Sequence, residues 1–349
     1  MRILYGIQTT GRGHIVRGRA LVKELIDQGH TVNIVLSGPP IQDNWIPEYF
    51  KNYNHYRGLT YVIEQGRINI PKSVKNLDIT QFIQDIKKFD PEDYDIVVTD
   101  YEPITSRFAQ ISKIPSIGIG HLYAFIHKVP IPTLPNPIHF LVMRYFAPAK
   151  YPIGLHWHHF NSPILPPTIP ADVHNAETLR ENKIIVYLNF EELDDIIELC
   201  SPFTDYEFYI YYPVKEAYDR GHLHIRPINR ENFQKNLSDA VGVISNSGFS
   251  LSSEAIHLGK KLLTRPVQYQ MEQEANAKAL EHLDLGMVMK DLDKERVEQW
   301  LGEPRPTPAD YPYAFTELAT WISKGDYENT DELVRKLWSR TGYVPELKE

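Results

Sequence analysis

A histidine and an aspartate are the first residues in this sequence whose types suggest catalysis. His14 ends a polar, glycine-containing turn at residues 9–14, which follows a short apolar run at residues 3–7. A histidine with an unperturbed pKa of ~6.5 suits a general base near neutral pH. Asp100 directly follows another apolar run, residues 96–99, and a carboxylate there could orient a histidine and stabilise its protonated form. The alternatives are a capping or surface histidine and an aspartate that caps the next helix.

The turn before His14 also limits the nucleotides that it could bind. Gly11 and Gly13 allow the backbone to turn tightly and to approach a ligand. The helix that follows would offer its partly positive N-terminus. However, the third glycine of a dinucleotide fingerprint is missing, and so is the Lys-Ser/Thr pair of a P-loop. The turn therefore argues against NAD and ATP.

A third turn combines small polar residues with a nearby carboxylate. It follows an apolar run and comprises Asn246, Ser247, Gly248, Phe249 and Ser250. Residues of this kind at the start of a helix bind phosphate. Glu254 lies about one turn further on, where its carboxylate could accept hydrogen bonds from both hydroxyls of a ribose. The alternative is an ordinary capped helix.

A fourth turn, residues 266–273, is rich in side chains that form several hydrogen bonds. Gln270, Glu272 and Gln273 are of the types that bind the hydroxyls of sugars. The alternative is a polar surface loop.

These turns must be held at the ends of strands, and the apolar pattern predicts those strands. Strands are expected at residues 3–7, 31–36, 96–99, 116–120, 184–188, 208–212, 223–226, 241–244 and 262–264. Helices are expected from residue 15 to the glycine at 29, and at residues 103–112, 191–199, 231–237, 251–257 and 272–283. Alternating strands and helices are typical of parallel sheets, which bind ligands at the carboxyl ends of their strands. The sequence thus predicts two doubly wound, Rossmann-like α/β domains.

A proline-rich connector separates the two halves. Residues 161–170 contain four prolines, so this segment fits neither a helix nor a central strand. We expect an N-terminal, acceptor-side domain over residues 1–160 and a C-terminal, nucleotide-sugar-binding domain over residues 161–325. In the final segment, 326–349, the amphipathic stretch at 331–338 is expected to form a helix that crosses back to the first domain.

Composition excludes several classes of protein. The 349 residues carry a net charge of −8, from 37 basic and 45 acidic residues, which argues against nucleic acid as a partner. The single cysteine, Cys200, excludes an intrachain disulfide and a cysteine-rich metal site, and it suits a reducing compartment. The first apolar run is too short for a signal peptide, and no run approaches the ~20 residues of a membrane span. We therefore expect a cytoplasmic protein.

Two further stretches have both a functional and an ordinary interpretation. Residues 122–151 are rich in proline and aromatic residues and include Lys128, Arg144 and Lys150. They could touch a lipid-linked acceptor or the inner face of a membrane, with an interfacial helix at 139–145, or they could be core. His156 and His158 would share one face of a strand, but no carboxylate lies near them in the sequence, so no metal site is expected.

The four turns, in this order, resemble GT-B glycosyltransferases. Residues 246–286 resemble the donor-binding signature of the peptidoglycan lipid-I N-acetylglucosaminyltransferase and the plant UDP-glycosyltransferases, and residues 11–14 resemble their N-terminal Gly-x-Gly-His loop. The matching signature residues are Gly248, Glu254, Ala255, Gly259, Pro266, Glu272, Gln273 and Asn276. Most of the chain is more closely similar to a group of uncharacterised bacterial and archaeal GT-B proteins. Residues 10–17, 57–60, 100–103, 145–148, 245–254 and 268–276 carry that similarity.

The resemblance implies roles for these residues. His14 would be the general base, and Asp100 would orient it. Gly248 and its neighbours would lie on the diphosphate of the donor, and Glu254 would hold the ribose. The Glu-Gln pair at 272–273 would touch the hydroxyls of the donor sugar.

The chain also departs from the plant enzymes. Asn246 and Ser250 stand where those enzymes carry a histidine and an asparagine, and their uracil-stacking tryptophan has no clear equivalent here. The base is therefore expected against the loop that contains Arg226 and Ile228, as in the peptidoglycan enzyme.

The expected function is inverting, metal-independent transfer of a sugar from a nucleotide diphosphate sugar, expected to be a UDP-sugar. The acceptor would be a hydroxyl of a saccharide or of a lipid-linked molecule, as in the synthesis of cell-envelope polysaccharides. The nucleotide sugar is a substrate, and no cofactor is expected. Two alternatives remain: a nucleotide-sugar 2-epimerase on the same fold, and a non-catalytic nucleotide-sugar-binding protein.

Overall fold

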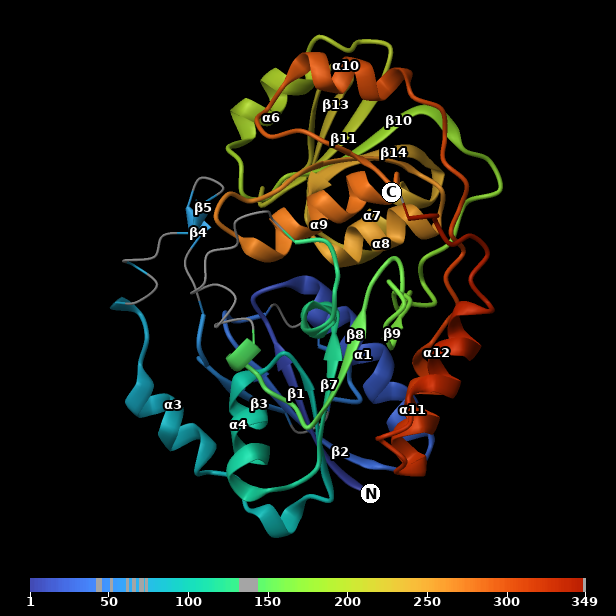
Figure 1. Cartoon of the computed structure of the whole chain (residues 1–349). Coiled ribbons are helices and arrows are strands. Elements are labelled where there is room, and N and C mark those ends of the chain that lie inside the picture. The colour runs from blue at the N-terminus through green and yellow to red at the C-terminus, as the bar shows by residue number, and fades with distance from the viewer. Residues whose placement is uncertain are drawn as a thin grey trace.

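The protein is described here from a computed structural model (Figure 1). The structure describes residues 1–41, 46–50, 53–60, 63–64, 67–68, 72, 75–131 and 144–347. Within these residues the chain forms two α/β units, each built on a seven-stranded sheet, and a small two-stranded sheet of β4 (Ile63–Glu64) and β5 (Arg67–Ile68). The prediction of two doubly wound α/β units is confirmed.

The first sheet has the strand order β3-β2-β1-β6-β7-β8-β9, and its strands run parallel. The strands are β1 (Arg2–Gln8), β2 (Thr31–Ser37), β3 (Tyr53–Tyr56), β6 (Ile96–Asp100), β7 (Ser116–Gly120), β8 (Tyr151–Leu155) and β9 (Ile164–Leu165). The helical elements are α1 (Arg12–Asp27), α3 (Ile79–Ile86), η2 (Pro91–Asp93), α4 (Pro103–Ser112) and η3 (His121–Ile126). Since β1 pairs with both β2 and β6, the order of strands reverses at β1, and ligands bind at such a reversal.

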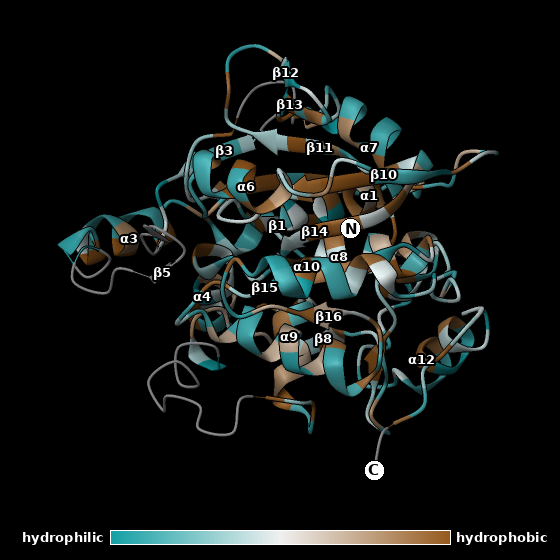
Figure 2. Ribbon diagram, turned by 90° about the horizontal axis from the view of Figure 1, so that it is seen from above, coloured by the Kyte–Doolittle hydropathy of each residue, from teal (hydrophilic) through white to brown (hydrophobic). Residues whose placement is uncertain are grey.

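The second sheet has the order β12-β13-β11-β10-β14-β15-β16, in which only β12 is antiparallel to its neighbour. Its strands are β10 (Arg180–Tyr187), β11 (Glu207–Tyr212), β12 (Tyr218–Arg220), β13 (Leu223–Pro227), β14 (Ala240–Asn246), β15 (Lys261–Arg265) and β16 (Met287–Val288). The helices of this unit are α6 (Leu193–Cys200), α7 (Arg230–Asp239), α8 (Phe249–His257), α9 (Met271–His282) and α10 (Lys294–Gly302). The strand order reverses at β10, which pairs with both β11 and β14. In Figure 2 β10 and β11 each contain a stretch drawn in hydrophobic brown, as expected where a strand is covered on both faces.

The proline-rich connector contributes a strand to the first sheet. Ile164 and Leu165 form β9, which pairs with Gly154 and Leu155 of β8. The first sheet thus continues beyond residue 160, where the first unit was expected to end. An edge strand tolerates neighbouring prolines because one of its sides needs no ladder hydrogen bonds.

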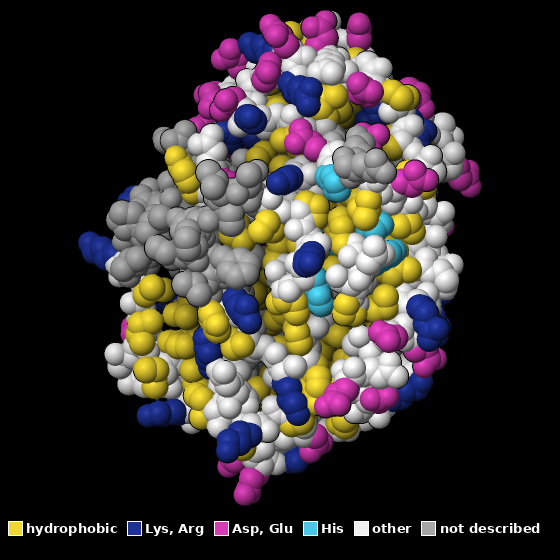
Figure 3. All heavy atoms as spheres, in the orientation of Figure 1, with side chains coloured by type: hydrophobic (Ala, Val, Ile, Leu, Met, Phe, Trp, Pro, Cys, Tyr) yellow, Lys and Arg dark blue, Asp and Glu magenta, His cyan; other side chains and the backbone are white. Residues whose placement is uncertain are grey.

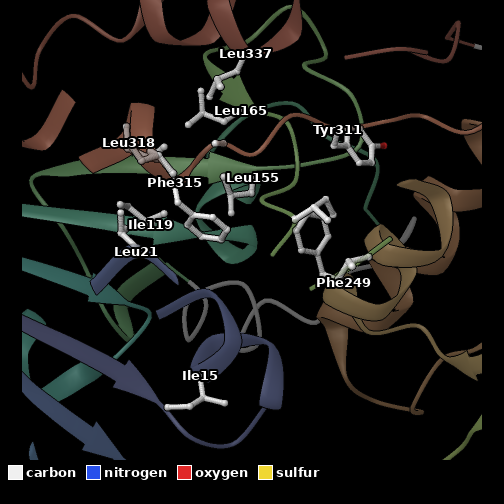
Figure 4. Packing of buried hydrophobic residues seen from close by; sticks show 14 of the residues in the cluster. Ile15, Leu21, Ile119, Leu155, Leu165, Phe249, Tyr311, Phe315, Leu318 and Leu337 are labelled. Atoms are coloured by element: carbon white, nitrogen blue, oxygen red, sulfur yellow. The ribbon is translucent and has the colours of Figure 1, made fainter. Parts of the chain in front are cut away.

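The last two helices, α11 (Phe315–Lys324) and α12 (Asp331–Trp338), lie beside α1 and β9 of the first unit (Figure 1). Tyr313, just before α11, donates its hydroxyl to Glu24 Oε1 of α1 at 3.0 Å. Trp338 donates its indole N–H to the backbone carbonyl of Ile164 at 2.7 Å. The buried core is continuous across these contacts, from Ile15 and Leu21 of α1 to Phe315 and Leu337, together with Phe249 of the second unit (Figure 4).

Candidate functional site

A cavity of about 450 Å³ lies between the two units, at the carboxyl ends of both sheets. The first unit lines it with Thr10, Gly11, Arg12, Gly13, His14, Val16, Arg17, Tyr101, Gly120, His121 and Leu122. The second unit lines it with Tyr187, Asn189, Phe190, Pro213, Ile228, Asn229, Arg230, Phe233, Asn246, Gly248, Phe249, Ser250, Leu251, Glu254, Gln270, Glu272 and Gln273. On the face shown in Figure 3, acidic side chains gather toward the two ends, and the band between them is largely hydrophobic with several histidines. Twelve of the residues predicted from the sequence are in this lining, namely Gly11, Gly13, His14, Ile228, Asn246, Gly248, Phe249, Ser250, Glu254, Gln270, Glu272 and Gln273.

The predicted histidine and aspartate meet at the floor of the cavity. His14 lies in the first turn of α1, directly after β1, and Asp100 is the last residue of β6, which pairs with β1. His14 Nδ1 lies 2.7 Å from Asp100 Oδ1, so Nδ1 carries a proton and its N–H donates a hydrogen bond to the carboxylate. Nε2 is then the ring nitrogen left to accept a proton from a molecule in the cavity.

A third residue, Arg17, completes this arrangement. Its Nε donates to Asp100 Oδ2 at 2.7 Å and its Nη2 donates to Asp100 Oδ1 at 2.6 Å. Burial alone would raise the pKa of the Asp100 carboxyl, but the charges of Arg17 and His14 lower this pKa below its usual range. Asp100 is therefore an ionised carboxylate although it is completely buried.

Asp100 does not cap the helix that follows it, which was the alternative interpretation. The N-cap of α4 is Glu102, whose carboxylate accepts hydrogen bonds from the backbone N–H groups of Ile104 and Thr105 at 2.8 and 2.7 Å. Because Glu102 serves as the cap, both oxygens of Asp100 are available to Arg17 and His14.

The second unit presents a helix N-terminus to the same cavity. Gly248 is the N-cap of α8, and the space where its Cβ would lie is open. Gly248, Phe249 and Ser250 line the cavity, so the first backbone N–H groups of α8 are at its wall. These N–H groups lack partners within the helix, and the helix dipole favours an anion beside them.

Glu254 lies on the same helix and is buried beside the cavity. Its Oε1 accepts a hydrogen bond from Arg230 Nη1 at 3.0 Å, and its Oε2 accepts one from Gln234 Nε2 at 2.8 Å. A carboxylate oxygen can accept more than one hydrogen bond, so Glu254 retains capacity for a ligand. Arg230 is held from its other side by Asp172, through two hydrogen bonds of 3.1 Å.

The start of α9 supplies the remaining polar wall. Gln273 accepts a hydrogen bond at Oε1 from the backbone N–H of Val267 at 3.0 Å, which leaves its amide NH₂ as the group free to orient toward a ligand. Burial raises the pKa of the Glu272 carboxyl, while the charges of His14 and Arg17 act in the opposite direction. Glu272 thus shares the electrostatic environment of the His14–Asp100 pair.

Comparison with known families identifies the chain. The sequence matches glycosyl transferase family 1 over residues 1–130 and 120–303. The chain belongs to this family. No curated protein matches the sequence.

Solved structures show that this glycosyltransferase has the GT-B fold. It resembles the glycotransferase of kitacinnamycin, with 14% identity and a TM-score of 0.62 over 97% of this chain and 99% of that one. It also resembles Arabidopsis thaliana UGT89C1 complexed with quercetin, with 13% identity and a TM-score of 0.61 over 97% and 99% of the two chains. A Streptomyces sp. SF2575 glycosyltransferase, SsfS6, complexed with thymidine diphosphate, matches with 14% identity and a TM-score of 0.57 over 99% and 96%.

Two residues predicted to bind the donor lie outside the cavity lining of the glycosyltransferase. Arg226 forms an ion pair with Asp219 at 2.8 Å and donates to the carbonyl of Tyr218, because the hairpin of β12 and β13 brings those residues to it. Ser247 is completely buried, and its carbonyl accepts a hydrogen bond from Asn276 at 2.9 Å. Ile228, two residues beyond Arg226, does line the cavity.

The predicted strand face of His156 and His158 is also not formed, because β8 ends at Leu155. The Nδ1 atoms of His156 and His158 accept hydrogen bonds from the backbone N–H groups of Trp157 and Phe160. In the described part of the chain no cluster of three or more His, Cys, Asp or Glu side chains is arranged to hold a metal ion.

Sequence reasoning missed the residues that join the two units of the glycosyltransferase. Arg12 donates to the hydroxyl of Tyr187, at the end of β10, at 3.3 Å. His121 stacks on Phe249, with ring centroids 4.0 Å apart, and its Nε2 lies 2.5 Å from Asn276 Oδ1. Tyr187 could have been found, because it ends the strand at which the second sheet reverses. The contacts of His121 cross between units, and no local pattern predicts them.

Proposed function

We propose that this glycosyltransferase transfers a sugar from a UDP-sugar to a hydroxyl group, with inversion at the anomeric carbon and without a metal ion. The observation that carries the proposal is the His14–Asp100 pair facing the N-terminus of α8 across one cavity. His14 Nε2 takes the proton of the acceptor hydroxyl while its oxygen forms a bond to the anomeric carbon. The bond from that carbon to the diphosphate oxygen breaks, and its electron pair leaves with UDP.

The leaving diphosphate gains negative charge as its bond breaks, and α8 supplies the compensating field. The N–H groups of Phe249 and Ser250, in the first turn of α8, place the positive end of the helix dipole at the wall of the cavity. Groups that are fixed in place before the reaction stabilise such charge without reorganisation, which removes the need for a metal ion.

The nucleoside is proposed to lie between Glu254 and the aromatic wall of the second unit. Glu254 would accept hydrogen bonds from the ribose hydroxyls, and Tyr187, Phe233 and Ile228 would flank the base. Similar structures support a pyrimidine nucleoside diphosphate: UGT89C1 is complexed with UDP in one structure, and SsfS6 with thymidine diphosphate in another.

The acceptor is proposed to enter from the first unit. Val16, Tyr101 and Leu122 form an apolar wall beside His14, which favours an acceptor that has an apolar part next to its hydroxyl. A lipid-linked saccharide, as in cell-envelope synthesis, meets that requirement. UGT89C1, which has a similar fold, is complexed with quercetin, an aromatic molecule that carries hydroxyl groups.

A nucleotide-sugar screen tests the proposed function. A ligand at about 100 times its Kd stabilises the folded state by about 2.7 kcal/mol, so UDP-sugars should raise the Tm more than ADP- or GDP-sugars do. NMR of the product with a model hydroxyl acceptor should show the anomeric configuration opposite to that of the donor. Retention of configuration, or stabilisation by purine nucleotide sugars alone, would contradict the proposal.

A 2-epimerase is the second candidate, because Glu272 places an additional carboxyl with a raised pKa in the neighbourhood of His14. Incubation of the UDP-sugar without an acceptor separates the two functions. An epimerised donor would support the epimerase, and an unchanged donor would support the transferase.

Contact with a membrane is a further part of the proposal. Of the segment 122–151, residues 132–143 lie outside the described residues, and so does most of the expected interfacial helix at 139–145. Within the described residues, no helix combines the length and apolarity required to span a bilayer. Arg144 and Lys150 are both exposed, as binding to anionic headgroups requires.

The double variant Arg144→Glu/Lys150→Glu is expected to lower co-sedimentation with anionic liposomes severalfold at low salt, since each basic residue near such a surface contributes about 1 kcal/mol. UDP affinity, measured by calorimetry, should not change. Lys235→Glu/Lys290→Glu is the matched control, since it reverses the same amount of charge at exposed sites of the second unit. Wild-type protein that remains in the supernatant would eliminate the membrane contact.

A further inference from the structure

The guanidinium of Arg17 binds the Asp100 carboxylate through two hydrogen bonds, an arrangement called here the fork, which restricts the orientation of this carboxylate. Arg17 binds both oxygens, with its Nε on Oδ2 at 2.7 Å and its Nη2 on Oδ1 at 2.6 Å. His14 Nδ1 shares Oδ1 at 2.7 Å. A Cβ on Gly120 would lie 3.3 Å from Asp100 Oδ1 and 3.4 Å from Arg17 Nη2, so the glycine permits this close packing.

We propose that Arg17 is a positioning residue for the reaction: it fixes which oxygen of Asp100 meets His14, and thereby which nitrogen of His14 carries the proton. The inference rests on the proposed function, in which His14 Nε2 is the proton acceptor. Arg17 lies one helical turn after His14 on α1, so both side chains reach Asp100 from the same face of one helix.

The charge of Arg17 keeps Asp100 ionised. A buried carboxylate without a partner takes up a proton, because its charge is poorly solvated. Protonated Asp100 would no longer require a proton on His14 Nδ1, and the imidazole could carry its proton on Nε2 instead. In that tautomer Nε2 has no lone pair to accept the proton of an acceptor hydroxyl.

Arg17 can no longer bind both sides of residue 100 when Asp100 is replaced by asparagine. Arg17 Nη2 lies 3.2 Å from His14 Nδ1, and both atoms donate to the same oxygen of Asp100. Asparagine offers one acceptor oxygen and one NH₂ group in place of two acceptor oxygens, so an N–H group of Arg17 must face that NH₂ group in either orientation of the amide. The influence of Arg17 on His14 through residue 100 is therefore lost in Asp100→Asn.

Other ionisable groups face this cluster from the elements around it. Tyr5 of β1 and Tyr123 of η3 are buried, and burial raises the pKa of both hydroxyls, so both remain neutral across the accessible pH range. Glu272 of α9 is the other carboxyl that interacts with Arg17 and His14. Changes of activity with pH in Arg17 variants must therefore be compared with those of Glu272→Gln.

The test uses Arg17→Met, Arg17→Lys, Asp100→Asn and the double variant Arg17→Met/Asp100→Asn in the full-length enzyme. Arg17→Met is expected to lower kcat by about 10²-fold, the usual effect of a misplaced catalytic group. The donor KM and the UDP Kd should change less than about twofold, because Arg17 does not contact the donor site in this proposal. Arg17→Lys retains the charge without the fork and should recover part of kcat.

Two readouts separate positioning from a structural role. In the wild-type enzyme the charge of Arg17 lowers the pKa of Asp100. Arg17→Met removes that charge, so Asp100 should take up a proton at a higher pH. The acidic limb of the kcat/KM profile should therefore move to higher pH. The double variant should be about as slow as Asp100→Asn alone, because Arg17 acts on the reaction through Asp100. A structural role predicts losses that add.

An unchanged kcat and pH profile in Arg17→Met would overturn the inference, and so would additive losses in the double variant. The double variant replaces a buried ion pair by a neutral pair, so it remains informative where Arg17→Met alone unfolds. Failure of the proposed function has a different signature, in which His14→Ala retains full turnover.

Discussion

Replacement of His14 by alanine is expected to lower kcat by roughly 10²–10⁴-fold, which is the usual contribution of a general base. The reason is the geometry at the cavity floor, where Asp100 holds Nδ1 and leaves Nε2 to accept the proton of the acceptor hydroxyl. Affinity for UDP should be nearly unchanged, because the donor is proposed to lie against α8, which belongs to the other unit and lines the cavity. Steady-state kinetics and calorimetry with UDP measure the two effects separately.

His14→Gln is the matched variant for this experiment. Its amide can still donate a hydrogen bond to Asp100 but cannot act as a base near neutral pH, so it should be as slow as His14→Ala while perturbing the site less. Full turnover in either variant would remove His14 from the mechanism. A loss of UDP binding as large as the loss in kcat would indicate that the cavity had collapsed.

Local sequence patterns predicted the sheets and the turns that carry the site, because each strand is an apolar run followed by a polar or glycine-containing turn. They placed the start of the first helix at residue 15, whereas α1 begins at Arg12. The two glycines were assigned to a loop because glycine is common in turns. In the structure Gly11 is the N-cap of α1, and Gly13 lies in its first turn. The earlier start places His14 on the same helix as Arg17.

Contacts between residues far apart in the sequence could not be predicted from local patterns. Arg17 and Asp100 are 83 residues apart, and only the pairing of β1 with β6 brings α1 over the end of β6. The absence of Arg226 from the cavity lining has a similar origin. β12 consists of three exposed residues without apolar alternation, so the hairpin that draws Arg226 to Asp219 leaves no signal in the sequence.

Predictions that relied on residue type alone were the least secure. The four prolines of residues 161–170 argued for a connector, yet Ile164 and Leu165 between them pair with β8. By residue type Asp100 was the natural N-cap for α4, yet the structure assigns the cap to Glu102. Asp100 is the last residue of β6 and binds Arg17, whereas Glu102 directly precedes the helix.

Glu254→Ala is expected to weaken UDP binding by about 1.5–3 kcal/mol, or roughly 10- to 150-fold in Kd, through the loss of a charge-assisted hydrogen bond to the ribose. The variant should remain folded, because Asp172 still pairs with Arg230 after Glu254 is removed. Glu254→Gln keeps the shape of the side chain and one acceptor oxygen, so its loss in affinity should be smaller.

Gln273 should behave differently, because it is proposed to contact the sugar and not the nucleotide. Gln273→Ala is unsuitable as the test, since it leaves the backbone N–H of Val267 without its acceptor at 3.0 Å and disturbs the loop. Gln273→Glu keeps that acceptor and replaces the NH₂ donor by a carboxylate oxygen, whose negative charge acts on UDP and on the UDP-sugar alike. It should therefore weaken binding of the intact UDP-sugar by about tenfold more than binding of UDP, the effect of one lost hydrogen bond of about 1.4 kcal/mol. Calorimetry with UDP and with the UDP-sugar decides the matter: equal losses for both ligands in Gln273→Glu would show that the nucleotide and the sugar do not occupy separate parts of this cavity.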